Sequence, residues 1–204
     1  MSLGSAMALQ VIDLPCPGCG APSSTADATC KYCGRPVVIS SFSNLIGMGI
    51  PDLKKHAGSY KSGLQEAPDD PTLNSALGMC YLKLGLYAEA SDCLRKAMDE
   101  DIENSETYFY AAVALLEGKK AFLTPMATVR RAEEYLEAGI QLEPRGVYYL
   151  MLAYLAYDFD ERKCLNRRVT YRDYLAQAVA HQLTQTDTTL LMEVLRRDAL
   201  GFPA

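Results

Sequence analysis

The chain has 204 residues, of which 49% are hydrophobic, and its formal net charge is −5. That apolar content excludes a disordered protein, and the acidic balance argues against a non-specific nucleic-acid binder, which needs clustered Lys and Arg. The sequence has neither an apolar run of the roughly 18 residues that span a bilayer nor the basic start and apolar core of a signal peptide. We therefore expect a cytoplasmic protein with no membrane association.

The first ten residues are interpreted as a leader, because the opening MSLGSA resembles a tag remnant that precedes a second methionine at position 7. The next segment carries four of the seven cysteines. An odd number of cysteines, with four in tight pairs, fits a reducing compartment better than a disulfide scaffold.

The four cysteines form two Cys-x-x-Cys-Gly turns, at residues 16–20 and 30–34. In such a turn successive backbone N–H groups point at the first sulfur, and the glycine permits the positive φ that closes the loop. Two turns supply four thiolates, the donor set of a tetrahedral Zn²⁺ site with Zn–S distances of about 2.3 Å. We predict one structural zinc ion per chain, bound by Cys16, Cys19, Cys30 and Cys33.

Cysteine pairs of this spacing have two alternative uses. Thioredoxin-type redox chemistry would place a Cys-x-x-Cys pair at a strand–helix junction of a βαβ unit, and no such pattern surrounds either pair. An iron or iron–sulfur site is the second alternative. With four cysteine ligands the ion would have no open position at which to activate water.

Residues 11–42 resemble a short zinc ribbon, in which residues 37–39 would form a strand after the second turn. This segment has too few apolar residues to fold alone, so metal binding would supply most of its folding free energy, about 10 kcal/mol or more. A ribbon of this kind can bind nucleic acid or cover a neighbouring domain. Nucleic acid is disfavoured because Lys31 and Arg35 are its only basic residues and Tyr32 is the only aromatic candidate for its surface.

Residues 43–50 read as a linker, and Pro51 and Asp52 then begin a helix, because Pro suits the first turn and a carboxylate suits the positive end of the helix dipole. Residues 71–104 form a 34-residue unit of two amphipathic helices. Its first half places Leu77, Gly78 and Tyr81 on one face, and its second half places Ala90, Leu94 and Ala97 on another.

The same spacing recurs on both sides of this unit. Residues 52–67 match its second helix, residues 105–144 match both helices with eight extra residues somewhere in 118–131, and a weaker third unit begins at Val147. The pattern resembles the tetratricopeptide (TPR) repeat. That resemblance implies an all-α solenoid of antiparallel helix pairs over residues 51–204, in which the lone first helix lacks its partner and the ribbon is the nearest cover.

The TPR resemblance also implies a concave groove lined by the first helix of each pair. The residues expected there are mostly apolar: Met79, Leu82, Lys83, Phe109, Val113 and Leu116. A lone Lys does not match the Lys and Asn pattern of repeats that clamp a C-terminal carboxylate. Two occupants remain, a protein or peptide segment from a partner and the chain's own C-terminal helix, expected at residues 188–200.

Two segments depart from a plain repeat, residues 118–131 and the charged stretch 158–168. The adjacent basic pairs at 130–131, 167–168 and 196–197 are interpreted as solvated helix faces. No nucleophile–base pair, phosphate-binding loop or paired-carboxylate motif occurs, so we expect no enzyme activity.

These observations predict a non-catalytic protein-interaction scaffold, with the zinc ribbon capping or extending the repeats, and they are compatible with a homo-oligomer. The alternative is a nucleic-acid or transcription-associated protein that acts through the ribbon.

Overall fold

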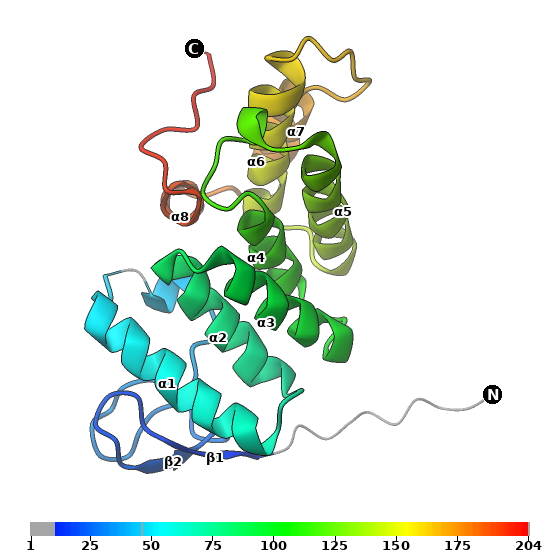
Figure 1. The fold of residues 1–204 in the computed structure, drawn as a ribbon. Helices are drawn as coiled ribbons and strands as arrows, with labels where there is room; N and C mark the ends of the chain where they lie inside the picture. The colour runs from blue at the N-terminus through cyan, green and yellow to red at the C-terminus, as the bar shows by residue number, and fades with distance from the viewer. Residues whose placement is uncertain (1–10, 46, 204) are drawn as a thin grey trace, which may run out of the picture.

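The computed structural model describes residues 11–45 and 47–203, so the expected leader at residues 1–10 lies outside the described residues. A small two-stranded sheet is followed by eight α-helices within this part of the chain (Figure 1). The strands are β1 (Asp13–Pro15) and β2 (Pro22–Ser24), and short 3-10 turns occupy Phe42–Leu45 and Ala121–Leu123. The helices are α1 (Ile50–Glu66), α2 (Pro71–Leu84), α3 (Tyr87–Glu100), α4 (Ser105–Leu115), α5 (Met126–Leu142), α6 (Gly146–Leu155), α7 (Tyr171–Ala180) and α8 (Gln185–Leu195).

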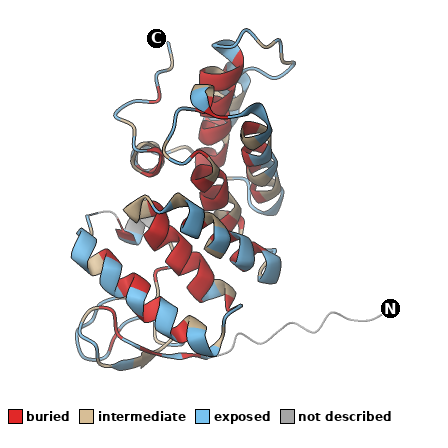
Figure 2. Ribbon diagram, in the orientation of Figure 1, coloured by how far each residue is buried: buried red, intermediate tan, exposed pale blue. Residues whose placement is uncertain are grey.

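The helices pack as antiparallel pairs, α2 with α3, α4 with α5 and α6 with α7, and each pair contacts the next (Figure 1). This confirms the all-α, TPR-like arrangement. Helix α1 packs on α2 as an unpaired second helix, as the repeat spacing predicts. Inner helices α2, α4 and α6 are buried on most sides, so their sequences are almost uniformly apolar, whereas α3 and α5 are amphipathic (Figure 2).

Local sequence explains the boundaries of the central pair. The Asp70 side chain accepts a hydrogen bond from the Leu73 backbone N–H, and Pro71 occupies the first turn of α2, where a missing N–H costs nothing. Gly85 ends the helix with φ 79°, a left-handed conformation that a residue without Cβ adopts readily. A two-residue turn then returns the chain as α3.

Gly78 lies where α2 and α3 approach most closely. A Cβ atom built at this position would lie 2.6 Å from Leu94 Cγ and 3.4 Å from the Ala90 carbonyl oxygen. The close approach expected from the repeat pattern is therefore present, and it depends on the absence of a side chain.

The extra residues of the second repeat lengthen the turn between α4 and α5. This connection spans residues 116–125 and contains the 3-10 turn Ala121–Leu123, and α5 is also longer than α3. The third repeat is present as α6 and α7. Helix α6 continues without a break into a π-helical segment, Ala156–Glu161, and residues 162–170 then form a loop, so the charged stretch is both a helix extension and a loop.

The expected strand at residues 37–39 is absent. Thr29 and Pro36 form an isolated bridge, and the strands of the small sheet lie earlier in the chain. Val37 and Ile39 are instead buried, and their backbone groups hydrogen-bond to the Tyr60 hydroxyl of α1 in place of a neighbouring strand. Residues 43–50 are more than a linker, since Leu45 is fully buried and its turn contacts α2.

The C-terminal helix is shorter than expected and begins earlier. Helix α8 starts at Gln185, where Thr184 and Asp187 form a capping box, and ends at Leu195 because Arg196 takes a left-handed conformation. The expected range of 188–200 is corrected accordingly. Helix α8 packs on α6 (Figure 1).

Candidate metal centre and the inner face of the repeats

The two Cys-x-x-Cys-Gly turns have the same backbone geometry. Gly20 and Gly34 have φ values of 77° and 70°, and their N–H groups donate to the carbonyl oxygens of Cys16 and Cys30 at 2.8 and 2.9 Å. The Gly18 and Tyr32 N–H groups point at the sulfurs of Cys16 and Cys30, at 3.3 and 3.5 Å. The positive φ values and the N–H groups directed at sulfur follow the expectation from the sequence.

The four sulfur atoms gather in one cluster, all within 4.8 Å of one another. Cys16 Sγ lies 3.6 Å from Cys33 Sγ, and Cys19 Sγ lies 3.7 Å from Cys30 Sγ, so each close pair joins the two turns. Bonds of about 2.3 Å to a tetrahedral zinc ion place sulfur atoms about 3.8 Å apart. The donor set and its spacing therefore fit a divalent metal ion.

The thiols affect one another's ionisation. Backbone N–H groups of Cys33 and Tyr32 lower the pKa of the Cys30 thiol to about 6. At Cys19 the Ala21 N–H acts in the same direction, but burial and the three neighbouring thiols outweigh it and raise the pKa to about 11. Four thiolates this close repel one another, and a bound cation removes that repulsion.

The cysteine segment is held on α1 by side chains that the sequence analysis did not select. The Tyr60 hydroxyl accepts a hydrogen bond from the Ile39 N–H at 3.0 Å and donates to the Val37 carbonyl at 3.3 Å, while His56 Nδ1 lies 3.0 Å from the same hydroxyl. Tyr60 is fully buried, and burial raises its pKa. The signal available from sequence was only that two polar aromatic residues lie one turn apart on the apolar face of α1.

This contact continues the hydrophobic core of the repeats into the cysteine segment. Ile12, Leu14 and the cysteines at 16 and 30 belong to the same buried cluster as α1 and α2. At Gly63 an added Cβ would lie 2.8 Å from Leu73 Cδ1 and 3.4 Å from Ile12 Cγ2. The segment thus covers the face of α1 that its missing partner helix would cover.

The six residues expected to line an open groove are not open to solvent. Met79, Leu82, Phe109, Val113 and Leu116 are each at most 2% exposed. The Lys83 side chain is 20% exposed, and its ammonium group is paired with Glu193 of α8.

Contacts between successive repeats explain much of this burial. The Phe109 ring of α4 stacks on Tyr148 of α6 with centroids 5.3 Å apart, and Ser75 of α2 lies within hydrogen-bonding distance of Thr107 of α4. The sequence-based assignment of these side chains to an accessible groove is corrected, because neighbouring inner helices pack on each other.

Helix α8 lies across the inner face near the C-terminal ends of α2 and α4. The Arg196 guanidinium donates to the Lys83 carbonyl at 2.9 Å, and that of Arg197 donates to the Gly118 carbonyl at 3.1 Å. Leu190, Leu191, Val194 and Leu195 are buried in the same core as the repeats. Both arginines of this pair therefore hold chain segments together, contrary to the expected solvated face.

A second network of charges joins α5 to the end of α6. Arg130 contacts Asp160 at 2.6 Å and Glu133 at 2.8 Å, and Arg167 contacts the same two carboxylates at 3.0 and 2.6 Å. Both carboxylates are buried, and the hydrogen bond to Asp160, together with Glu133, raises the pKa of Arg130. In the pairs 130–131 and 167–168, one arginine is thus an internal contact. Telling it from its neighbour requires knowledge of the tertiary fold.

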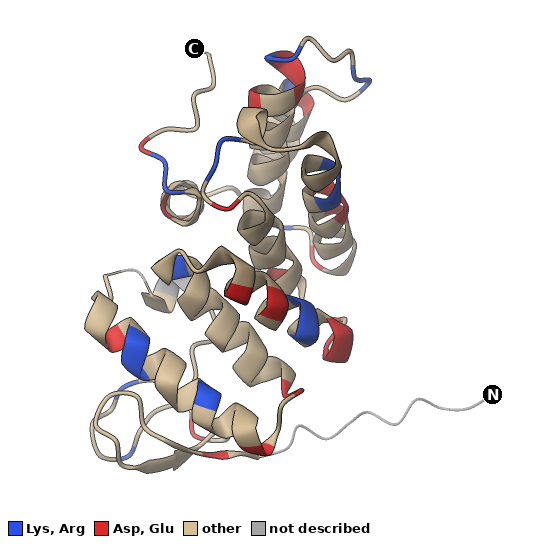
Figure 3. Cartoon of the chain, in the orientation of Figure 1, with Lys and Arg blue, Asp and Glu red and all other residues tan. Residues whose placement is uncertain are grey.

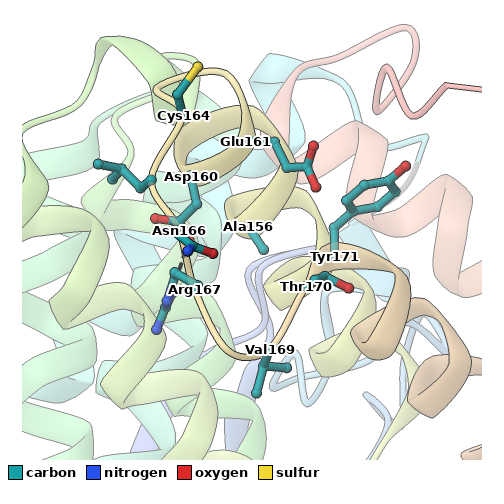
Figure 4. A pocket seen from close by; sticks show the side chains of 10 residues that line it. Ala156, Asp160, Glu161, Cys164, Asn166, Arg167, Val169, Thr170 and Tyr171 are labelled. Atoms are coloured by element: carbon teal, nitrogen blue, oxygen red, sulfur yellow. Dashed lines mark hydrogen bonds and ion pairs between the residues drawn. The ribbon is translucent and has the colours of Figure 1, made fainter.

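A cavity of about 200 Å³ lies between the loop of residues 162–170 and the segments on either side of it. Figure 4 shows Arg167 and Asn166 on one side of this loop and Glu161 and Tyr171 on the other, with Cys164 at its tip. Arg167 and Asp160 line the cavity and are paired with each other. The polar groups here therefore hold the loop in place.

Charged side chains avoid the inner helices (Figure 3). In α2 the only charged residue is Lys83, α4 has only Glu106, and α6 has none, whereas α3 and α5 carry charges of both signs. No helix among the described residues is long and apolar enough to cross a membrane.

Together these features define an all-α, TPR-like helical repeat protein with a four-cysteine cluster of metal-ligand geometry at its N-terminal end. No protein-family model and no curated protein matches the sequence. Among solved structures, the chain is similar to one described as "MamA MSR-1 C2", with a TM-score of 0.50, 17% identity and coverage of 68% of this chain and 71% of that one. A second, "MamA AMB-1 P212121", gives a TM-score of 0.50, 16% identity and coverage of 74% of each chain. At such identity the likeness concerns the fold alone.

Proposed function

We propose that this protein is a non-catalytic interaction scaffold, in which the inner face of the helical repeats binds a segment of another protein. The observation that carries the proposal is the inner face itself. Three repeats present almost uncharged helices to a common side, and a single C-terminal helix rather than a further repeat lies across them. A helix held in a groove of helices is a common mode of protein recognition.

The four cysteines would hold one structural Zn²⁺ ion, and the ribbon that they organise would close the N-terminal end of the repeats. The supporting observations are the sulfur spacing, the matched N–H contacts and the burial of α1 beneath the ribbon. Four thiolate ligands would leave no position for substrate, so the ion would stabilise the fold and take no part in a reaction.

Elemental analysis of the purified protein tests the metal. We expect about one zinc per chain, a Co²⁺-substituted form with the absorption of tetrahedral thiolate coordination, and loss of both in Cys16→Ser. Cys164→Ser is the matched control, because this cysteine is exposed and lies outside the cluster. Metal-free protein from a native purification would refute the zinc site. Iron as the dominant metal would show that the four cysteines form an iron site instead.

Site-specific photo-crosslinking in the native cell tests the interaction surface. A crosslinking residue at Lys83, on α2 at the inner face, should give a protein adduct of defined mass, and one at Arg95, on the exposed side of α3, should not. A third position, Tyr32, is 75% exposed at the second cysteine turn and reports on the ribbon. Adducts at Tyr32 that a nuclease removes, with none at Lys83, would favour the nucleic-acid alternative and overturn the proposal.

The nucleic-acid alternative receives little support from the ribbon's charges. Lys31 is paired with Asp27 at 3.7 Å, and Arg35 is paired with Asp52 of α1 at 3.9 Å. Both basic residues therefore face carboxylates of the same chain, which weakens their attraction for phosphate.

A further inference from the structure

Helix α8 has the features of a bound ligand rather than of another repeat. It follows the last helix pair, and its buried side chains come from its C-terminal half, where Leu190, Leu191, Val194 and Leu195 join the core. Its N-terminal turn, from Gln185 onward, is largely exposed. A repeat helix would pack along its whole length against a partner from its own pair, and α8 has no such partner among the described helices.

The charges at this contact are complementary and specific. Lys83 is the single charged residue of α2, and Glu193 is the single acidic residue in the buried half of α8. The two side chains form an ion pair, and both are less than one third exposed. Burial and the neighbouring Arg196 lower the pKa of Lys83, so Glu193 offsets an otherwise unfavourable pair of cations.

Both ends of helix α8 are capped by groups within the helix and its flanking residues. Its start is closed by the reciprocal hydrogen bonds between Thr184 and Asp187, and its end by the left-handed Arg196, and these caps are local to the helix. Residues 181–184 connect it to α7, and the first of them is held on α6, because the Gly146 N–H donates to the His181 carbonyl at 3.1 Å and the Tyr149 and His181 rings stack with centroids 4.7 Å apart. Movement of α8 therefore turns on Leu183 and Thr184, and it must also separate Phe202 from Tyr171, whose rings stack with centroids 6.0 Å apart.

We propose that α8 is an internal stand-in for the partner, which is an amphipathic helix that exchanges with α8 on the inner face. This proposal rests on the proposed function and specifies its ligand. The partner helix carries an aliphatic stripe of the α8 type, with apolar residues at i, i+1, i+4 and i+5. Its acidic residue stands at i+3, the position of Glu193 in α8, where it meets Lys83. The evidence for this chemistry is the contact that α8 itself makes, since its aliphatic side chains and Glu193 are the groups that the inner face accepts.

Charge reversal in the full chain tests the exchange. Glu193→Lys places a second cation beside Lys83 and should release α8, so that its amides lose protection from hydrogen exchange while those of α2 to α7 keep theirs. Lys83→Glu should release α8 in the same way. The double variant Lys83→Glu with Glu193→Lys restores the pair and should restore protection. Lys96→Glu, on the exposed side of α3, is the control for a charge reversal that leaves α8 seated.

Binding of a synthetic peptide with the sequence of residues 183–203 then tests the surface. The Glu193→Lys chain should bind this peptide roughly ten-fold more tightly than the unaltered chain, in which α8 competes from within. The Lys83→Glu chain should reject the same peptide and accept one carrying Glu193→Lys. This reciprocal specificity would not arise from non-specific adhesion to exposed apolar side chains.

Two results would overturn the inference. One is full protection of α8 in both single variants; the other is release of α8 without peptide binding at the inner face. A doubled molecular mass of the Glu193→Lys chain in light scattering would contradict a separate partner, because it would show that the inner face binds α8 of a second copy of the chain. The proposed function fails separately, when the peptide binds as expected but crosslinks at Lys83 capture no protein in the cell.

Discussion

At Gly78 the contact between α2 and α3 depends on the absence of a single carbon atom. We expect Gly78→Leu to lower the free energy of unfolding by about 1–3 kcal/mol or more, because the new side chain must displace Leu94 and press on the α3 backbone. Denaturant unfolding measures the change.

Gly58→Leu is the matched control for this substitution. Gly58 is an exposed helical glycine with no atom within 4 Å of an added Cβ, so a better helix former should leave stability unchanged or raise it by up to about 1 kcal/mol. Equal midpoints for the two variants would contradict the helix pairing described above.

His56 makes stability depend on pH. Burial lowers its pKa from the usual 6.5, with Arg35 acting in the same direction and Asp52 opposing them. The unfolded chain therefore takes up a proton at a higher pH than the folded chain does. The stability held by neutral His56 is complete above pH of about 6.5 and is lost as the pH falls toward the lowered pKa.

The predicted measurement is the melting temperature between pH of about 7.5 and 5.5. We expect the unaltered chain to lose more stability over this range than His56→Gln, which keeps a polar group beside Tyr60 but does not titrate. Parallel curves for the two proteins would show that His56 has no part in the pH dependence.

At the scale of elements, the network of Arg130, Glu133, Asp160 and Arg167 joins α5 to the extension of α6. Arg130→Met would leave two buried carboxylates with Arg167 as their shared cationic partner. We expect a loss of roughly 2–4 kcal/mol, reduced from the value for a fully buried pair because Arg130 is 30% exposed.

The neighbouring arginine supplies the control. Arg131 is exposed and donates a hydrogen bond to its helix neighbour Tyr135 at 3.2 Å, so Arg131→Met should change stability by less than about 0.5 kcal/mol. Thermal unfolding with limited proteolysis in residues 162–169 reads both stability and loop order. Similar behaviour of the two variants would assign Arg130 to the surface after all.

The elements that sequence reasoning predicted well are those set by local periodicity. The spacing of Leu77, Gly78 and Tyr81, repeated 34 residues on, gave α2 to α7 and the longer turn near residue 118, because each pair buries the same face in the same way. The two cysteine turns were predictable because four residues within each turn decide its geometry.

What sequence could not predict depends on contacts between distant segments. Val37 and Ile39 have strand propensity, yet their burial is decided by Tyr60 on another element. Phe109 looks exposed on a single helical pair and becomes buried once α6 stacks on α4. Likewise Arg130 and Arg131 are indistinguishable in sequence, and only the position of Asp160 separates their roles.

For the whole molecule, the repeat arrangement predicts how far the loss of metal at the N-terminal end lowers the local stability of the other helices. Each repeat contacts chiefly its neighbours, so a disturbance should weaken with distance from its source. The ribbon would derive about 10 kcal/mol or more of its folding free energy from a bound metal ion, and it covers one side of α1. Removing the ion should therefore uncover α1 first.

Hydrogen exchange with and without a strong chelator measures this gradient. We expect amides of residues 11–39 to exchange fully, those of α1 to exchange much faster, α2 and α3 to change less, and α6 and α7 to remain as they were. Cys16→Ser should reproduce the pattern without chelator, and Cys164→Ser should not. Uniform acceleration along the chain would instead mean that the ribbon and the repeats unfold as one cooperative unit, and α6 would then lose its protection together with α1.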